Sequence, residues 1–269
     1  MKLACYRCHE WPCVCVDGIT IVHGNCLDVL PTLGQVDHVI TDPPYEAEAH
    51  TLQRRTKETF APRVNGVDMR PATVKAVDFA PISVELRLAA AHEIARVVKR
   101  WALVFCQAEA VAAWRDALIY GGLSWRRSCV WVKPDGQPQL SGDRPGMGYE
   151  SIACAHAVGR SYWNGGGRLG VFTCATKSDP DSERTGHVTQ KPMRLMTQLI
   201  ELFTDPGDLI LDPFAGSFTT AVACKQLGRR CIGIELEEKW CAVGAKRLDA
   251  TTTPLFVLEP ETGKQEAML

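Results

Sequence analysis

The sequence lacks any apolar run long enough to cross a membrane. No stretch approaches the roughly 18 consecutive apolar residues that mark a transmembrane helix. The start, Met1-Lys2-Leu3-Ala4-Cys5, lacks the apolar core of a secretory signal peptide. We therefore expect a cytoplasmic protein with no membrane partner. The chain has 269 residues, 46% hydrophobic and 23% charged, which is typical of one globular domain with or without a small appendage.

An excess of positive charge is also lacking, because 30 Lys and Arg residues face 31 Asp and Glu residues, for a formal net charge of −1. This balance does not exclude nucleic-acid binding, since affinity for phosphate depends on local clusters. Each basic cluster is either a solvated face or a phosphate contact. The clusters are Arg54, Arg55, Lys57, Arg63, Arg70 and Lys75, then Arg126, Arg127 and Lys133, and finally Arg160 and Arg168.

A disulfide framework is not expected, although the chain has 12 cysteines, because a reducing compartment keeps thiols free. Most cysteines stand singly in apolar runs and are small buried side chains. Cys5, Cys8, Cys13 and Cys15 instead fall close together, at a spacing that suits tetrahedral zinc. We predict a structural zinc knuckle over residues 1–17, with His9 as a substitute ligand and a frayed terminus as the alternative.

A short apolar run from Val36 to Ile40 predicts a buried strand. It is followed by Asp42-Pro43-Pro44-Tyr45. Neither proline can donate a ladder hydrogen bond, so the strand must end at Asp42 and place a carboxylate and an aromatic ring at its carboxyl edge. Ligands bind at this edge in open α/β sheets. The Asp42 carboxylate, the Pro43 carbonyl and the Tyr45 ring are suited to holding a planar amine.

Asp42-Pro43-Pro44-Tyr45 resembles the catalytic motif of the S-adenosylmethionine (SAM)-dependent DNA amino-methyltransferases. The later segment Leu211-Asp212-Pro213-Phe214-Ala215-Gly216-Ser217 resembles their cofactor loop. A catalytic motif that precedes the cofactor loop is typical of their circularly permuted β group. The resemblance spans about residues 24–248. It implies a Rossmann-like class I methyltransferase fold, which is an α/β fold with a twisted, mostly parallel sheet, one reversed strand and helices on both faces.

The resemblance also implies roles for individual residues. Asp42 and Pro43 accept hydrogen bonds from the target amine, Pro44 stiffens the loop and Tyr45 stacks on the base. An acidic residue that ends the second strand of a nucleotide-binding unit can accept from both ribose hydroxyls, which predicts a ribose ligand at Glu235. The full expected cofactor set is Asn25, Cys26, Asp42, Thr189, Lys191, Asp212, Pro213, Phe214, Ala215, Gly216, Ser217, Glu235 and Leu236.

Two positions in this set, Asn25 and Lys191, and the neighbouring Phe218 carry more specific expectations. Asn25 stands where the family usually has an aspartate that meets the adenine amine; it either keeps that role through its amide oxygen or is a turn residue. Lys191 is expected to offset the carboxylate of the cofactor's methionine end. Phe218 replaces a glycine that usually continues the cofactor loop, and we predict that it adopts a helical first-turn conformation with its ring turned toward the sheet.

Apolar periodicity predicts the remaining elements. Strands are expected at residues 18–23, 102–106, 128–132, 151–157, 209–211 and 231–234. Helices are expected at residues 83–100, 108–120, 193–203 and 219–227, with a helical turn at 27–33. Residues 46–80 are polar and basic, and we expect a mobile loop that closes on DNA or on the target base. Residues 133–188 are expected to supply target recognition, with Tyr162 and Trp163 exposed for stacking on bases. A place in the core is the alternative for Trp163.

We therefore expect residues 18–269 to form a permuted catalytic domain that methylates the N6 amine of adenine in double-stranded DNA after base flipping. Restriction-modification is the expected setting. N4-cytosine methylation is the first alternative, followed by an RNA or protein amino-methyltransferase and an inactive DNA-binding module. The sequence leaves open whether the protein is a homodimer and which DNA sequence it recognises.

Overall fold

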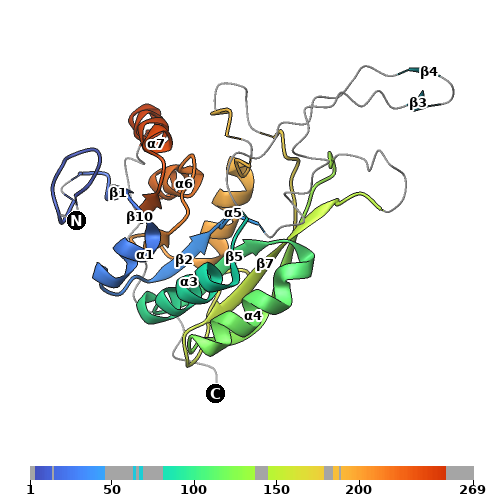
Figure 1. Cartoon of the computed structure of the whole chain (residues 1–269), viewed down its shortest axis with the longest axis horizontal. Coiled ribbons are helices and arrows are strands. Elements are labelled where there is room, and N and C mark those ends of the chain that lie inside the picture. Colours follow the sequence, from blue (N-terminus) through green and yellow to red (C-terminus); the bar gives the residue numbers. More distant parts are fainter. Residues whose placement is uncertain are drawn as a thin grey trace.

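The computed structural model describes residues 4–13, 15–45, 63–64, 67–68, 81–136, 145–178, 184–187 and 189–252. Its centre is an eight-stranded sheet with the strand order β1-β10-β9-β2-β5-β7-β6-β8 (Figure 1). The strands, in sheet order, are β1 (Ile19–His23), β10 (Arg230–Glu235), β9 (Leu209–Asp212), β2 (His38–Thr41), β5 (Trp101–Cys106), β7 (Tyr149–His156), β6 (Ser124–Val132) and β8 (Val171–Thr173).

Strand direction divides the sheet into a parallel part and a mixed part. β1, β10, β9, β2 and β5 are all parallel. β7 is antiparallel to both of its neighbours, β5 and β6, whereas β6 and β8 are parallel to each other. Among the strands described in this sheet, β7 is thus the one reversed strand, which confirms the expected class I fold.

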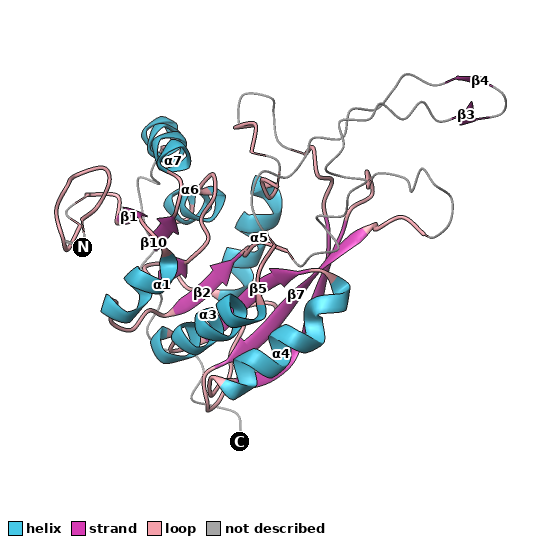
Figure 2. Ribbon diagram, in the orientation of Figure 1, coloured by secondary structure: helices cyan, strands magenta, loops and turns pink. Residues whose placement is uncertain are grey.

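Helices cover both faces of the sheet (Figure 2). α5 (Met193–Phe203), α6 (Thr219–Gln226) and α7 (Glu238–Ala250) share one hydrophobic core with one set of strand side chains. The other core contains α3 (Val84–Val97), α4 (Val111–Tyr120) and the short α1 (Cys26–Val29). The 3-10 turns η1 (Leu30–Thr32) and η3 (Ala108–Ala110) adjoin α1 and α4. None of the helices in the described segments is long and apolar enough to cross a bilayer.

The connections place a topological switch point between β9 and β2. β9 continues through α6 to β10, and α6 packs on one face; β2 continues to β5 by way of α3, which packs on the opposite face. Adjacent connections that leave on opposite faces open a crevice outside the carboxyl ends of the two strands. The strand that precedes Asp42 and the strand that precedes the Asp212 loop are therefore the pair at which this fold presents a ligand.

Most elements match the prediction, and α5 matches it to the residue because its apolar positions recur with helical spacing. Outside residues 46–80, two elements were missed: β8, which is only three residues long, and α7, whose buried face includes the small residues Cys241 and Gly244. β6 begins at Ser124, four residues before the expected start. Residues 46–80 fall almost wholly outside the described residues, but β3 (Arg63–Val64) and β4 (Val67–Asp68) form an antiparallel pair within that range.

Candidate active site

The carboxyl edge of the parallel strands gathers most of the predicted site residues. Asn25 follows β1, Glu235 ends β10, Asp212 ends β9 and Asp42 follows β2. These four strands are neighbours in the sheet. Residues separated by as many as 210 positions in the sequence therefore meet at one edge, with Asp42 and the Asp212 loop on the two sides of the switch point.

Asp42 is held by a lysine that comes from a distant segment. The Lys191 ammonium lies 2.5 Å from Asp42 Oδ2 and donates a second hydrogen bond to the Tyr45 hydroxyl, at 3.2 Å. The other carboxylate oxygen, Asp42 Oδ1, is buried and has no hydrogen-bond partner among the described residues. A buried acceptor without a partner is costly, so Oδ1 is the atom at this edge that most requires a donor.

Two further charged residues complete the surroundings of Asp42. Glu150, the second residue of β7, accepts from the Tyr45 hydroxyl and lies 3.3 Å from Lys191 Nζ through its Oε2 atom. Its Oε1 atom pairs with Lys133, which follows β6. The result is a cluster of two carboxylates, two ammonium groups and one phenol, which we call the Asp42 cluster: Asp42, Tyr45, Lys133, Glu150 and Lys191.

The pKa values in the Asp42 cluster reflect burial and opposing charges. Burial raises the pKa of Asp42 above its ordinary value, and the Glu150 charge adds to this effect, although Lys191 opposes it. Burial would also raise the pKa of Glu150, but the ammonium groups of Lys191 and Lys133 outweigh burial and lower it. The pKa of Tyr45 is raised well above its usual value, first by burial and then by the two carboxylates. Tyr45 therefore stays protonated and neutral, and its hydroxyl donates a hydrogen bond to Glu150.

The Asp212 carboxylate is committed to internal contacts. Its Oδ1 atom accepts from the Thr41 hydroxyl at 2.7 Å and from Phe214 N at 3.2 Å, and its Oδ2 atom accepts from the Thr220 hydroxyl at 2.6 Å. Burial raises its pKa to about 6. Asp212 thus joins β2, β9 and α6 and fixes the loop Pro213-Phe214-Ala215-Gly216-Ser217.

Gly216, in the loop that follows β9, contacts Glu235 at the end of the neighbouring strand β10. Glu235 Oε2 accepts from Gly216 N and Glu235 Oε1 accepts from Glu237 N, both at 2.8 Å. Gly216 has a φ of +50°, which disfavours any residue with a Cβ, and the His187 ring lies 3.3 Å from the position of that missing atom. His187 itself packs edge-on against Trp240, with the ring centroids 4.5 Å apart.

The other predicted cofactor residues border the same edge. Asn25 is exposed and its Oδ1 accepts from Leu27 N at 2.9 Å, so its side chain caps α1. Cys26 is buried, which raises its pKa to about 11. Leu236 is exposed, and Thr189 contacts His187 through its hydroxyl at 3.4 Å. Lys191, expected near the cofactor's carboxylate, is instead engaged by the Asp42 cluster.

Phe218 is placed partly as predicted. Its side chain is fully buried, and it fills the space above Gly233 of β10 and Gly244 of α7, where an added Cβ would lie 2.7 Å and 2.3 Å from the ring. The ring therefore packs toward the sheet, as expected. The predicted helical conformation is wrong, because Phe218 is left-handed, with φ 62° and ψ 33°, and lies at the N-cap of α6. The chain needs the positive φ here to turn from the loop into the helix.

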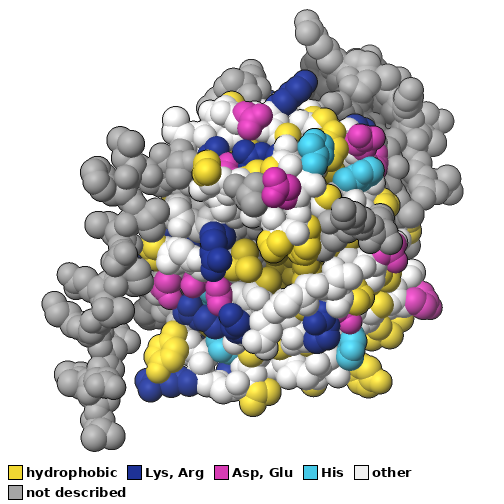
Figure 3. All heavy atoms as spheres, turned by 90° about the vertical axis from the view of Figure 1, so that its left-hand side faces the viewer, with side chains coloured by type: hydrophobic (Ala, Val, Ile, Leu, Met, Phe, Trp, Pro, Cys, Tyr) yellow, Lys and Arg dark blue, Asp and Glu magenta, His cyan; other side chains and the backbone are white. Residues whose placement is uncertain are grey.

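Part of the predicted recognition segment lies at the wrong edge of the sheet for contact with a target base. Tyr162 O accepts from the Trp101 indole at the start of β5, and Trp163 packs against Phe203 at the end of α5. These are amino ends of parallel strands, opposite to Asp42. Arg126 bonds Gly159 O at this same opposite edge, whereas Lys133 belongs to the Asp42 cluster. On the face in Figure 3, Lys and Arg side chains are intermingled with Asp and Glu side chains.

Sequence reasoning missed Glu150 and the role of Lys133. A signal for Glu150 was present, because it is the second residue of a strand whose following residues, Ser151 to His156, are all buried. A carboxylate at such a position requires a charged or hydrogen-bonding partner. The identity of that partner could not be read from the sequence, since Lys191 comes from another part of the chain.

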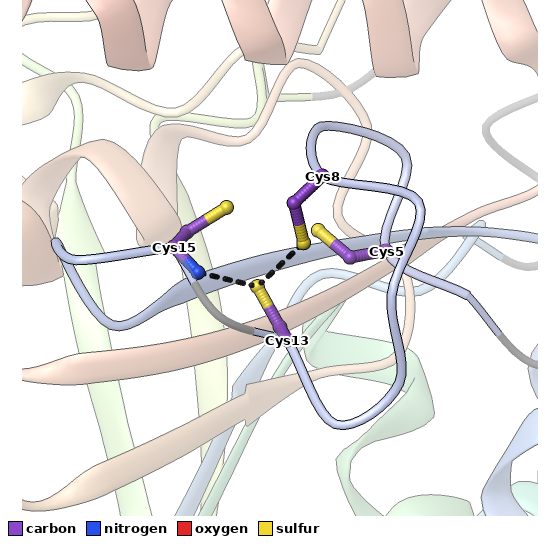
Figure 4. A group of neighbouring side chains, drawn as sticks. All are labelled: Cys5, Cys8, Cys13 and Cys15. Atoms are coloured by element: carbon purple, nitrogen blue, oxygen red, sulfur yellow. Dashed lines mark hydrogen bonds between the residues drawn. The ribbon is translucent and has the colours of Figure 1, made fainter.

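The four amino-terminal cysteines form a second cluster. The sulfur atoms of Cys5, Cys8, Cys13 and Cys15 all lie within 4.8 Å of one another and point toward a common centre (Figure 4). Cys8 Sγ and Cys13 Sγ are 3.7 Å apart, close to the roughly 3.8 Å expected between thiolates around tetrahedral zinc with bonds of about 2.3 Å. His9 is exposed and is not part of this group. The geometry therefore favours the four thiols over His9.

Comparisons with known proteins bear on the candidate active site. A family model for DNA methylases (N6_N4_Mtase) matches residues 36–246. The type II methyltransferase M.HinfI of Haemophilus influenzae is 28% identical over 255 residues, which cover 85% of this chain and 68% of that protein. The crystal structure of an M1.HpyAVI–SAM complex is 26% identical, with a TM-score of 0.65 over 86% of this chain and 99% of that chain.

The PvuII DNA methyltransferase (cytosine-N4-specific) shares the fold, with a TM-score of 0.64 and 14% identity over 86% of each chain. The family match begins at the strand that leads to Asp42 and ends within α7, so it includes Asp42, the Asp212 loop and Glu235 but not β1 or Asn25. By this match and this fold, the chain belongs to the N6_N4_Mtase family of DNA methylases, which have the class I SAM-dependent methyltransferase architecture.

Proposed function

We propose that this protein transfers a methyl group from SAM to the N6 amine of adenine in double-stranded DNA. The observation that carries the proposal is the buried Asp42 Oδ1 atom, which lacks a donor among the described residues. An exocyclic amine supplies such a donor. Asp42 stands at the switch point of the sheet and within the part of the chain that matches the DNA methylase family.

The residues at the neighbouring strand ends fit SAM. The Glu235 carboxylate is half-buried at the end of β10, where Oε2 accepts from Gly216 N and Oε1 accepts from Glu237 N. An ionised carboxylate has about four acceptor sites, which leaves acceptor capacity for the ribose hydroxyls. Gly216 lets the backbone approach a ligand without a side chain in the way. Leu236 supplies an exposed apolar surface beside Glu235. When bound, SAM supplies an activated methyl group on a positively charged sulfur, which is an excellent leaving group.

The catalytic task of the chain is to present the target amine. Asp42 Oδ1 and the Pro43 carbonyl would accept hydrogen bonds from the amine and draw its lone pair out of conjugation with the ring. Tyr45 would pack against the base, with its hydroxyl fixed by Glu150. A stacked and paired base cannot reach this buried edge, so the base must leave the duplex. Much of the rate enhancement should then come from alignment.

The choice of adenine over cytosine rests on the motif. An aspartate before Pro-Pro-Tyr is more typical of adenine enzymes in the family that the chain resembles, and a serine is more typical of N4-cytosine enzymes. We expect N6-methyladenine as the product when the protein is incubated with SAM and unmethylated genomic DNA. Digestion to nucleosides followed by mass spectrometry measures it, and N4-methylcytosine as the sole product would contradict the assignment.

DNA contact is proposed for segments beside Asp42. Residues 46–80 directly follow the catalytic motif and carry the first basic cluster. In the range 133–188, the segments that follow β6 and β8 begin at the same edge as Asp42, because Val132 pairs with Tyr149 and Thr173. We assign target recognition to these segments and withdraw it from Tyr162 and Trp163, which lie at the opposite edge.

The cysteine cluster is a proposed structural zinc site that tethers the amino terminus to the edge of the sheet. Tyr6 N donates to Ile21 O of the edge strand β1 at 2.7 Å. Arg7 pairs with Asp17 at 2.9 Å, and Asp17 in turn lies 3.2 Å from Lys225 of α6. Four thiolates would close the coordination sphere and leave no position for a substrate, so the site would serve folding rather than catalysis.

Purified protein is expected to carry about one zinc ion per chain, bound by four thiolates. Cys8→Ser should lower the zinc content strongly and increase proteolysis of the first 17 residues, because binding energy at such a site is folding energy. Cys174→Ser, a buried cysteine far from this cluster, is the matched control and should retain zinc. Elemental analysis of desalted protein measures the content, and absence of zinc from the unsubstituted protein would exclude the site.

A further inference from the structure

The Asp42 cluster contains more charge than the proposed chemistry requires. Its side chains are largely withdrawn from water, with exposed fractions of 7% for Lys191, 12% for Glu150, 16% for Lys133 and 21% for Asp42. Burying a single ammonium or carboxylate is costly, and removal of one partner from a buried pair leaves an uncompensated charge. Two carboxylates and two ammonium groups balance, so the cluster is electrically complete as it stands.

The contacts within the cluster are not symmetrical. Lys191 occupies Asp42 Oδ2 and leaves Oδ1 without a described donor. Glu150 uses Oε2 for both Lys191 and Tyr45, and uses Oε1 for Lys133. Lys191 is thus tied to Glu150 on one side and to Asp42 on the other. Rotation of the Asp42 carboxylate would break its contact with Lys191.

The segments that supply the cluster are anchored independently. Glu150 lies in β7, which pairs with both β5 and β6, and Lys133 N donates to Gly148 O at 2.8 Å. Lys191 directly precedes Pro192, the N-cap of α5, and its ammonium lies 5.0 Å from the centroid of the Phe105 ring. Glu150 is therefore held within the sheet, and Lys191 lies directly before a core helix.

We propose that Lys191 and Glu150 are positioning residues for Asp42: Lys191 keeps the carboxylate ionised and turned so that Oδ1 alone faces the target amine, and Glu150 holds Lys191 and the Tyr45 hydroxyl in place. The proposal rests on the proposed amino-methyl transfer. It gives Lys191 a function at the target base rather than at the carboxylate of the cofactor.

The charges around Asp42 determine how the proposal is tested. Lys191 and Lys133 favour the ionised form of Asp42, whereas Glu150 and Asp212 oppose it, and Tyr45 is neutral. Opposite charges within about 4–6 Å commonly shift a carboxyl pKa by one to three units. Removal of Lys191 and removal of the Glu150 charge should therefore shift the titration of Asp42 in opposite directions. Side chains that contribute only packing, with no electrostatic effect on Asp42, predict no such opposition.

The first test titrates Asp42 itself in the protein without substrates. Carboxyl-carbon NMR of aspartate-labelled protein follows the ionisation, with the Asp42 signal assigned by its loss in Asp42→Asn. Lys191→Met should raise the titration midpoint by at least about one pH unit, and Glu150→Gln should lower it. Lys225→Met removes another buried lysine, from α6, and should leave the midpoint unchanged. Equal midpoints in the wild type and both cluster variants would overturn the proposal, as would shifts in the same direction.

The second test measures initial rates with tritium-labelled SAM and unmethylated genomic DNA. Lys191→Met should lower kcat at least about tenfold at neutral pH, with a smaller loss at alkaline pH where Asp42 ionises without help; each pH unit changes an ionised fraction by up to about tenfold. KM for SAM should change little, and Lys191→Arg should restore part of kcat. A uniform loss at every pH would contradict the proposal. If the wild type failed to methylate DNA, the proposed function would be wrong, and the NMR titration would still test the positioning role.

Discussion

Replacement of Asp42 by alanine is expected to lower turnover at least about 100-fold, the scale of losing one preorganised polar group at a reacting centre. The substitution removes Oδ1, the buried acceptor without a described donor, and also frees Lys191 from its contact at Oδ2. Affinity for SAM should barely change, because the proposed cofactor contacts come from β9 and β10. Single-turnover kinetics and calorimetric titration with SAM measure the two quantities separately.

Glu235→Ala supplies the matched comparison and should have the reverse effect. Loss of a charge-assisted hydrogen bond to the ribose should weaken SAM binding by on the order of 1.5 to 3 kcal/mol, with a smaller effect on turnover at saturating SAM. Since Glu235 also accepts from Gly216 N, Glu235→Gln should be included to preserve volume and one acceptor. Equal effects of the Asp42 and Glu235 substitutions on SAM binding would show that the two roles are misassigned.

Phe218→Ala is expected to destabilise the fold by about 3 to 5 kcal/mol, the usual loss for a buried phenylalanine. The ring is fully buried against Gly233 and Gly244. Because these glycines have no side chains to fill the space, loss of the ring would leave a cavity. Phe218→Gly should be less destabilising by about 1 kcal/mol, because glycine adopts the left-handed conformation without the strain of a Cβ. Chemical denaturation measures the free energies of unfolding.

The informative result is which of the two Phe218 variants has the larger free energy of unfolding. Glycine normally destabilises a chain relative to alanine through the entropy of the unfolded state, so a more stable glycine variant would report the strain at position 218. Binding of SAM should change less than about tenfold, or 1.4 kcal/mol, in both. Much tighter binding of SAM by the glycine variant at unchanged stability would mean that the ring obstructs the cofactor site rather than packing in the core.

The sequence was most informative where the local residues restrict the backbone to one type of secondary structure. Pro43 and Pro44 cannot extend a ladder of hydrogen bonds, and β2 does end at Thr41, immediately before Asp42. The apolar positions of α5 repeat with helical spacing, and its bounds were predicted in full. Local chemistry determines both features, so neither depends on knowing what packs against them.

Features that depend on contacts between residues far apart in the chain could not be predicted from the sequence. The pairing of Lys191 with Asp42 and with Glu150 exists only because β7, the start of α5 and the end of β2 meet at one edge. The conformation predicted for Phe218 was wrong because it relied on helix propensity alone. The ring packs against Gly233 and Gly244, which come from distant parts of the chain and make room for it. Propensity describes the local chain, whereas both of these outcomes follow from tertiary packing.

The position of β1 has a consequence for how the protein is made. β1 is one of the two edge strands of the sheet, and its neighbour there is β10, with Ile19 opposite Cys231. At translation rates of about 5 to 20 residues per second, the roughly 200 residues between them take on the order of 10 to 40 seconds to synthesise. Throughout that time β1 has no strand to pair with. The edge that carries Asn25, Asp42 and Glu235 is therefore assembled late on the ribosome, after the mixed part of the sheet has already been made.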